Sequence, residues 1–270
     1  MRNMGWLAGA VLLAACGVGI GDGPIDGTKT GNPGQNAKVQ VQMAAYSSDE
    51  NVATVPQPQA LTTGVVVTRA IIGVEELEFV RPLPDGTCDT AILDDAYALE
   101  IHSFFAVDLV QGTALDELEI AKSDGFCAVN MSLEDGEELP AGTPLREFLD
   151  DARIYVEGTR ADGTPFFVRS KEVRDLPLLL ADLLQFQQDR ETYTISFDVA
   201  QWFADVDLDG AEASGGRILI DRRNNEDVLA QFEASVAGSL GLCRDPDRDD
   251  DRYESCDGER GGGDDRGSDD

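Results

Sequence analysis

An acidic hexapeptide, DVDLDG at residues 205–210, carries the side chains best suited to a chemical task. Oxygen ligands at alternate positions, followed by a glycine that permits a sharp turn, are typical of the first half of a calcium loop. The pattern then fails at two positions. The eighth holds Glu212, where an EF-hand needs an apolar core residue, and the twelfth holds Gly216, where it needs a bidentate glutamate. A looser calcium site and a solvated acidic loop both remain open. The candidate metal ligands are Asp205, Asp207 and Asp209.

Side chains for nucleophilic catalysis are scarce. His102 is the single histidine, so any Ser-His-Asp or Cys-His device would depend on it. The sequence contains no G-x-S-x-G motif, no phosphate-binding loop and no zinc signature. A pair of carboxylates could hydrolyse a glycan, but the 52 acidic residues make any one pair uninformative. We therefore predict no catalytic residue and expect His102 to face solvent.

Trp202 is the one tryptophan outside the first fifteen residues. A sugar-stacking platform requires an exposed ring, whereas core packing buries it. We favour core packing. Asp198 is a predicted N-cap for a short helical turn that contains Trp202 and leads into the 205–209 loop.

The first sixteen residues are typical of an export and lipidation signal. Arg2 gives a positive start, and residues 4–15 form an apolar run that is too short for a bilayer, which needs about 20 residues. The end of the run, LAAC at 13–16, resembles the bacterial lipobox, whose cysteine receives a diacylglycerol thioether and becomes the N-terminus. We predict a signal peptide over 1–15 and lipid attachment at Cys16, with an ordinary secretory signal as the alternative.

The lipobox resemblance also implies a destination. The residue after the cysteine is Gly17, whereas an aspartate there would imply retention in the inner membrane. A lipid-anchored protein of the outer membrane is therefore expected, and the sequence does not decide between the periplasmic and the surface face. Two or three acyl chains hold a protein stably, whereas one is marginal. The glycine-rich stretch 16–36 cannot bury enough surface to order itself, and we predict a flexible tether there.

Composition bounds the rest of the chain. Apolar residues make up 42%, which is enough for a core, and we predict one β-sandwich domain over 37–242. The formal net charge of −31 repels nucleic acid and favours cations or basic proteins as partners. Residues 243–270 are acidic with almost nothing to bury, and we predict a largely disordered tail.

The cysteines divide into one and four. With Cys16 lipidated, an even number remains for an oxidising compartment, and three pairings are possible. We favour the pairings that join nearby segments, which would stabilise the fold by about 4 and about 3 kcal/mol. A zinc site is the alternative, but no C-x-x-C pair occurs. The favoured pairs are Cys88–Cys127 and Cys243–Cys256.

Alternation of apolar and polar residues with period two predicts about eight strands. The fold class predicted is mainly β, an antiparallel β-sandwich with one or two short helices. Gly73 is expected to divide one strand region into two, and Asp162-Gly163 to form a hairpin turn. Helices are predicted at 175–186 and 225–240, the second capped by Asn225. The strand regions are 39–43, 65–80, 97–109, 127–133, 152–173 and 192–199.

Two loose motifs, FFAVDLVQG at 104–112 and ARIYVEGTRADGTPF at 152–166, accompany the lipobox and tether. Together they resemble a group of bacterial surface lipoproteins of unknown function with a domain similar to carbohydrate-binding-like β-sandwiches. The resemblance covers about residues 65–175, and the LPAGT at 139–143 matches only the start of a turn that often precedes the second motif. It implies a fold and transfers no functional residue.

The leading hypothesis is a lipid-anchored, non-enzymatic binding or structural module of the cell envelope. The alternative is a calcium-dependent adhesin or polysaccharide-binding lipoprotein, and a surface glycan hydrolase comes third. The expected partners are the membrane, through acyl chains on Cys16, and a polysaccharide or basic protein.

Overall fold

The computed structural model describes residues 36–46, 58–88, 90, 98–115, 117–122, 124–244 and 255–257. The predicted signal peptide, Cys16 and most of the tether and tail lie outside these residues. Within them, no helix combines the length and the apolar character that a bilayer crossing requires.

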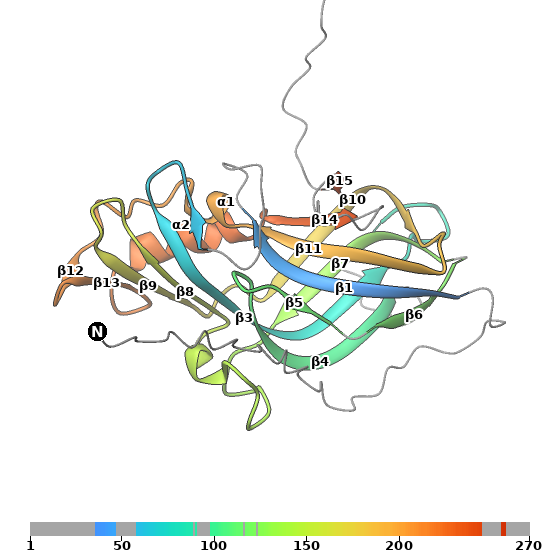
Figure 1. The fold of residues 1–270 in the computed structure, drawn as a ribbon, viewed down its shortest axis with the longest axis horizontal. Helices are drawn as coiled ribbons and strands as arrows, with labels where there is room; N and C mark the ends of the chain where they lie inside the picture. Colours follow the sequence, from blue (N-terminus) through green and yellow to red (C-terminus); the bar gives the residue numbers. More distant parts are fainter. Residues whose placement is uncertain are drawn as a thin grey trace, which may run out of the picture.

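Two sheets form the framework (Figure 1). In the first, β1 lies between β11 on one side and the short β5 and β6 on the other, and β14 and β15 extend the β11 side. The β1–β11 pair is parallel, whereas the other pairs of this sheet are antiparallel. Its strands are β1 (Asn36–Tyr46), β5 (Thr113–Ala114), β6 (Leu118–Ala121), β11 (Arg190–Asp198), β14 (Leu240–Arg244) and β15 (Ser255–Asp257).

The second sheet is larger and is built around β3. Its order is β10-β7-β3-β8-β9-β13-β12, with β2 and β4 also paired to β3. The β9–β13 pair is parallel, so the predicted antiparallel sandwich contains two parallel pairs. Its strands are β2 (Gln59–Ala60), β3 (Val66–Val80), β4 (Ala98–Asp108), β7 (Gly125–Leu133), β8 (Ile154–Thr159), β9 (Pro165–Ser170), β10 (Asp175–Gln185), β12 (Ala213–Ser214) and β13 (Arg217–Ile220).

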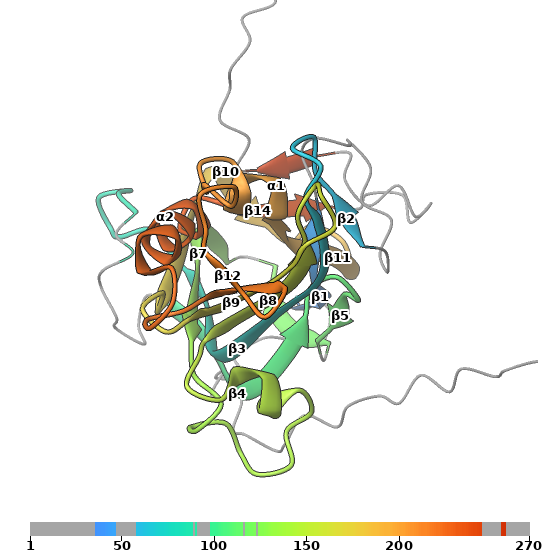
Figure 2. The ribbon, with the colours of Figure 1, turned by 90° about the vertical axis from the view of Figure 1, so that its left-hand side faces the viewer.

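In the part of the chain that the structure describes, helices are short and few, which confirms the predicted mainly β class. They are α1 (Val199–Phe203), α2 (Glu226–Val236) and a 3-10 turn, η1 (Arg146–Leu149). Figures 1 and 2 show α2 at one end of the molecule beside β9, and η1 on a segment that projects from the side opposite α2. Asp198 caps α1 as predicted, because its Oδ1 accepts the Ala200 and Gln201 amides at 3.0 and 3.3 Å.

One hydrophobic cluster joins both sheets and both α-helices. Its strands contribute every second residue, such as Val39, Val41 and Met43 of β1, all fully buried. Trp202 is also fully buried, and its ring meets Phe197 and Phe232 edge-on at 6.2 and 5.8 Å. Core packing of Trp202 is therefore confirmed, and the ring is not an exposed platform.

Gly73 lies where β3 changes partners. Up to Ile72 the strand pairs with β8, and from Val74 it pairs with β7, while β4 lies along its other edge. At the junction the Gly73 amide donates to the Arg153 carbonyl at 3.0 Å, and the Gly73 carbonyl accepts the Glu134 amide at 3.0 Å. The predicted break into two strands is wrong. β3 runs unbroken through Gly73, and the strand paired with it changes there from β8 to β7.

The Arg153 side chain fills the gap between β7 and β8. The residue is 5% exposed, and its Nε donates to the Leu133 carbonyl at 3.0 Å. Its Nη1 donates to the Lys171 carbonyl, and its Nη2 pairs with the Glu134 carboxylate at 3.2 Å. A guanidinium carries donors enough to satisfy all these acceptors at once. The ends of β7, β8 and β9 are thus bonded to one buried cation.

Two local predictions fail because tertiary contacts decide the conformation. Residues 175–185 form the edge strand β10, not a helix: Leu176 and Leu178 point into the core, while Pro177, which lacks an amide hydrogen, sits at an edge where none is needed. Asn225 precedes α2 in a left-handed conformation and does not cap it. Its amide instead bonds the backbone of Glu212 and Leu219.

The cysteines follow the prediction where the structure describes them. Cys88 and Cys127 form a disulfide with a sulfur–sulfur distance of 2.06 Å. Cys243 is disulfide-bonded, and the backbone of Cys256 lies opposite it in the β14–β15 register. The pairing of these two residues stays a prediction. The β15 segment also shows that part of the predicted tail joins the first sheet.

Gly73→Ala should be strongly destabilising, because a Cβ there would lie 2.1 Å from the Glu134 carbonyl oxygen. We expect a loss of about 3 kcal/mol in the free energy of unfolding, measured by denaturant titration. Gly86→Ala is the control: its Cβ meets nothing, so only its left-handed backbone, at φ 84°, should cost about 1 kcal/mol. Equal losses in the two variants would contradict the close approach at Gly73.

Arg153→Met should also destabilise the fold, because it leaves the half-buried Glu134 carboxylate and two carbonyl groups without their donor. The expected loss is about 3–5 kcal/mol. Arg222→Met, at a guanidinium whose side chain is 54% exposed, should change stability by less than about 1 kcal/mol. A loss at Arg153 no greater than at Arg222 would show that the junction does not depend on the guanidinium.

Candidate functional site

The 205–209 loop lies between α1 and β12, and hydrogen bonds of Asp207 hold its shape. Asp207 Oδ1 accepts the Gly210 amide at 2.8 Å, and the Asp207 amide donates to Gln231 on α2 at 2.8 Å. Asp209 has a 92% exposed side chain and lies 3.7 Å from Arg160. The Arg160 guanidinium is more tightly bound to Asp162 in the β8–β9 turn and lowers the pKa of that carboxyl.

The structure does not gather the three predicted calcium ligands. Within the described residues, Asp205, Asp207 and Asp209 are not among the groups of three ligands whose oxygens lie within 4.8 Å of one another. Asp207 also already serves as the acceptor of a turn. Calcium binding by this loop stays a prediction.

A different acidic cluster is present on the outer face of the second sheet. Glu76 and Glu78 of β3 and Glu100 of β4 bring one carboxylate oxygen each to within 4.8 Å of the others. The register explains this, because Glu78 lies opposite Glu100 and residues two apart on a strand share a face. Glu76 lies opposite His102, whose side chain is outside the described residues, so the expectation that it faces solvent stays open.

This glutamate cluster is partly covered. Glu78 is only 4% exposed, and Asn130 of β7 donates from Nδ2 both to Glu78 and to the Thr90 carbonyl, at 3.2 Å each. Thr90 follows Cys88, whose disulfide to Cys127 ties this connection to β7. Carboxylate and carbonyl oxygens are the ligands that calcium prefers, so these are the described residues best suited to hold a divalent cation.

Sequence reasoning missed the cluster although its signal was partly visible. The E-x-E of residues 76–78 and the E-x-H of 100–102 sit at outward positions of predicted strands. Nothing local, however, indicates which residue of one strand lies opposite which residue of the other.

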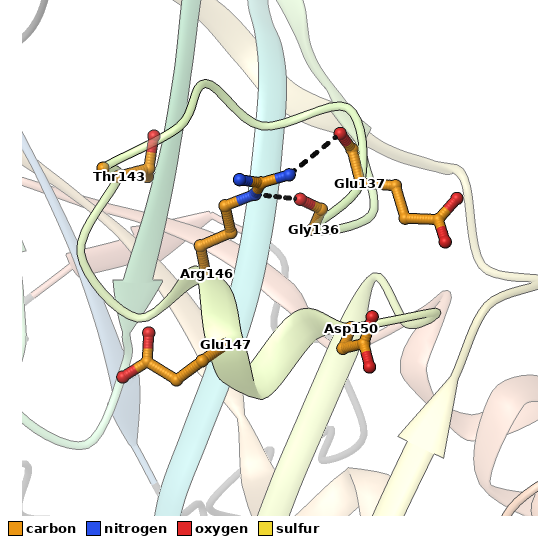
Figure 3. Close-up of a pocket in the computed structure, with 7 residues that line it drawn as sticks. Gly136, Glu137, Thr143, Arg146, Glu147 and Asp150 are labelled. Atoms are coloured by element: carbon orange, nitrogen blue, oxygen red, sulfur yellow. Dashed lines mark hydrogen bonds between the residues drawn. The ribbon is translucent and has the colours of Figure 1, made fainter.

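A hollow of about 450 Å³ lies in the connection from β7 to β8, beside η1 (Figure 3). Arg146 is at its centre, with Thr143 and Glu147 to one side and Glu137 and Asp150 to the other. The backbone of Gly136 and Gly142 completes the lining. Arg146 Nε donates to the Gly136 carbonyl at 2.5 Å, and its Nη2 donates to the Glu137 carbonyl at 3.3 Å.

The connection that forms this hollow packs on the outside of the sheet. Leu139 and Leu149 make a second apolar cluster with Ile71 and Tyr155. The Arg69 guanidinium stacks 4.6 Å from the Phe148 ring centre. Within this connection the sequence indicated only a turn, at LPAGT of residues 139–143.

Resemblance to known proteins is distant. No protein-family model matches the chain, and no curated protein matches it. Among solved structures the chain is similar to MbnP from Methylosinus trichosporium, with 12% sequence identity and a TM-score of 0.40. The similarity covers 67% of this chain and 82% of that chain. At this level the likeness carries no argument about function.

Proposed function

We propose that the chain is a lipid-anchored protein of the cell envelope whose β-sandwich is a non-enzymatic binding module. The observation that carries the proposal is the Cys88–Cys127 disulfide. Disulfides form and persist in oxidising compartments, which agrees with the export signal proposed from residues 1–16. The glycine-rich residues 17–35 would then separate β1 from the membrane.

Cys16→Ser tests the anchor. In the natural host, or in a bacterium with lipoprotein processing, we expect the wild-type chain to incorporate labelled palmitate and to sediment with outer membranes. The variant should lose the label because no other residue of the lipobox carries a thiol. Palmitate incorporation that survives Cys16→Ser would contradict the proposed attachment.

Purified wild-type protein also tests the non-enzymatic assignment. Hydrolysis of a glycan substrate that a single carboxylate substitution abolishes would contradict it.

A second candidate is a calcium-dependent binding module, favoured by the glutamate cluster rather than by the 205–209 loop. Three carboxylates held together, one of them buried, present oxygen ligands of the kind that calcium prefers. The cluster also sits on a rigid pair of strands under a disulfide-tied connection, so a cation there would join the sheet to its cover.

Thermal melts with calcium and with EDTA separate the two acidic sites. At a hundredfold excess over its Kd, a bound cation would add about 2.7 kcal/mol, which raises the melting temperature by a few degrees. We expect Glu78→Gln to abolish the shift and Asp207→Ala to retain it. The reverse result would move the site to the loop, and coincident wild-type melts would contradict calcium binding.

A further inference from the structure

We propose that the hollow beside η1 binds a neutral, polyhydroxylated ligand, namely a sugar unit. This inference rests on the proposed function as a binding module and names the class of ligand. Four features support it: the anchoring of the connection, its strained backbone, a prepositioned guanidinium, and the balance of charge around that guanidinium.

The connection from β7 to β8 is long but fixed at both ends. It starts at Glu134 and ends at Arg153, both bonded to Gly73. Lys171 of the β9–β10 turn then bridges the two ends, lying 3.1 Å from Asp135 and 2.6 Å from Asp151. Hydrogen bonding from this lysine lowers the pKa of Asp151. Long connections of this kind usually serve a function.

The backbone of the connection stores strain next to the hollow. Leu145 and Asp151, which flank η1, both have left-handed conformations, with φ of 64° and 53°. Such conformations are unfavourable for residues other than glycine and tend to occur at functional sites. Gly136 permits a close approach: a Cβ there would lie 2.7 Å from the Arg146 and Leu149 carbonyl oxygens. The hollow is therefore shaped by specific constraints on its backbone.

Arg146 is already held in place for a ligand. Its Nε and Nη2 are bonded to the backbone of its own connection, and within the described residues its Nη1 has no acceptor. The hydroxyl of Thr143 likewise has no partner in that part of the chain. A donor that is fixed before binding loses little side-chain entropy when the ligand arrives.

The balance of charge selects the ligand. Three carboxylates, those of Glu137, Glu147 and Asp150, surround the single guanidinium of Arg146, and within the described residues they form no ion pair. A small anion would be repelled by the three carboxylates, and a metal ion, although attracted by them, would leave Nη1 of the guanidinium without an acceptor. Neighbouring hydroxyl groups satisfy both, because each donates to a carboxylate and accepts from the guanidinium or from Thr143. The volume of about 450 Å³ lies within the usual range for small-molecule sites, about 300–1,000 Å³.

Saturation-transfer NMR tests the assignment with the full-length chain in a detergent that has no sugar headgroup. The probes are glucose, galactose and mannose, with glucuronate as an anionic counterpart of glucose. We expect saturable transfer to at least one neutral sugar, and a lower Kd for glucose than for glucuronate, which the three carboxylates repel. Glu147→Ala and Thr143→Val should each weaken that binding by about tenfold or more.

Glu138→Ala is the matched control, because Glu138 is an exposed glutamate of the same connection that does not line the hollow. It should leave sugar binding unchanged, and equal melting temperatures will show that all three variants are folded. Three results would overturn the proposal: no transfer to any neutral sugar, a preference for glucuronate over glucose, or binding that Glu147→Ala and Thr143→Val leave intact. None of them bears on palmitate labelling at Cys16, so the proposed anchor is judged separately.

Discussion

The hydrogen bonds of Gly73 hold together the parts of the second sheet. Its amide and carbonyl bond Arg153 and Glu134, the two ends of the connection from β7 to β8. Strand β3 can therefore pair with β8 before Gly73 and with β7 after it. The absence of a Cβ lets that connection start directly over the strand. The buried Arg153 guanidinium then satisfies the carbonyls that the division of the sheet would leave unpaired.

Features that depend on local sequence were predictable. The alternation of apolar and polar residues predicted the strands that bury one face, such as β1 and β11. The predicted hairpin turn at Asp162-Gly163 has glycine at φ 83°, as a tight turn requires. The disulfide Cys88–Cys127 followed from proximity along the chain. Helix α2 was found from its apolar stripe, although Asn225 bonds the backbone of Glu212 and Leu219 in place of a cap.

Features that depend on distant partners were not predictable. A glycine within a strand pattern indicates a break equally well as a junction, and only the neighbours of Gly73 distinguish the two. The leucine-rich run of β10 fits a helix until β7 is known to lie beside it. The candidate sites follow the same rule: the facing of Glu78 and Glu100 is set by register, and the Arg146 hollow is set by how its connection folds back on the sheet.

Amide hydrogen exchange under native conditions tests the central role of Gly73 most directly. If the junction belongs to the cooperative core, the amides of Gly73 and Glu134 will exchange only through global unfolding, with the same free energy as amides around Leu77 in the middle of β3. Faster exchange of Gly73 and Glu134, through a local opening that leaves the Leu77 region protected, would show that the connection detaches from the sheet and that β3 does not depend on it.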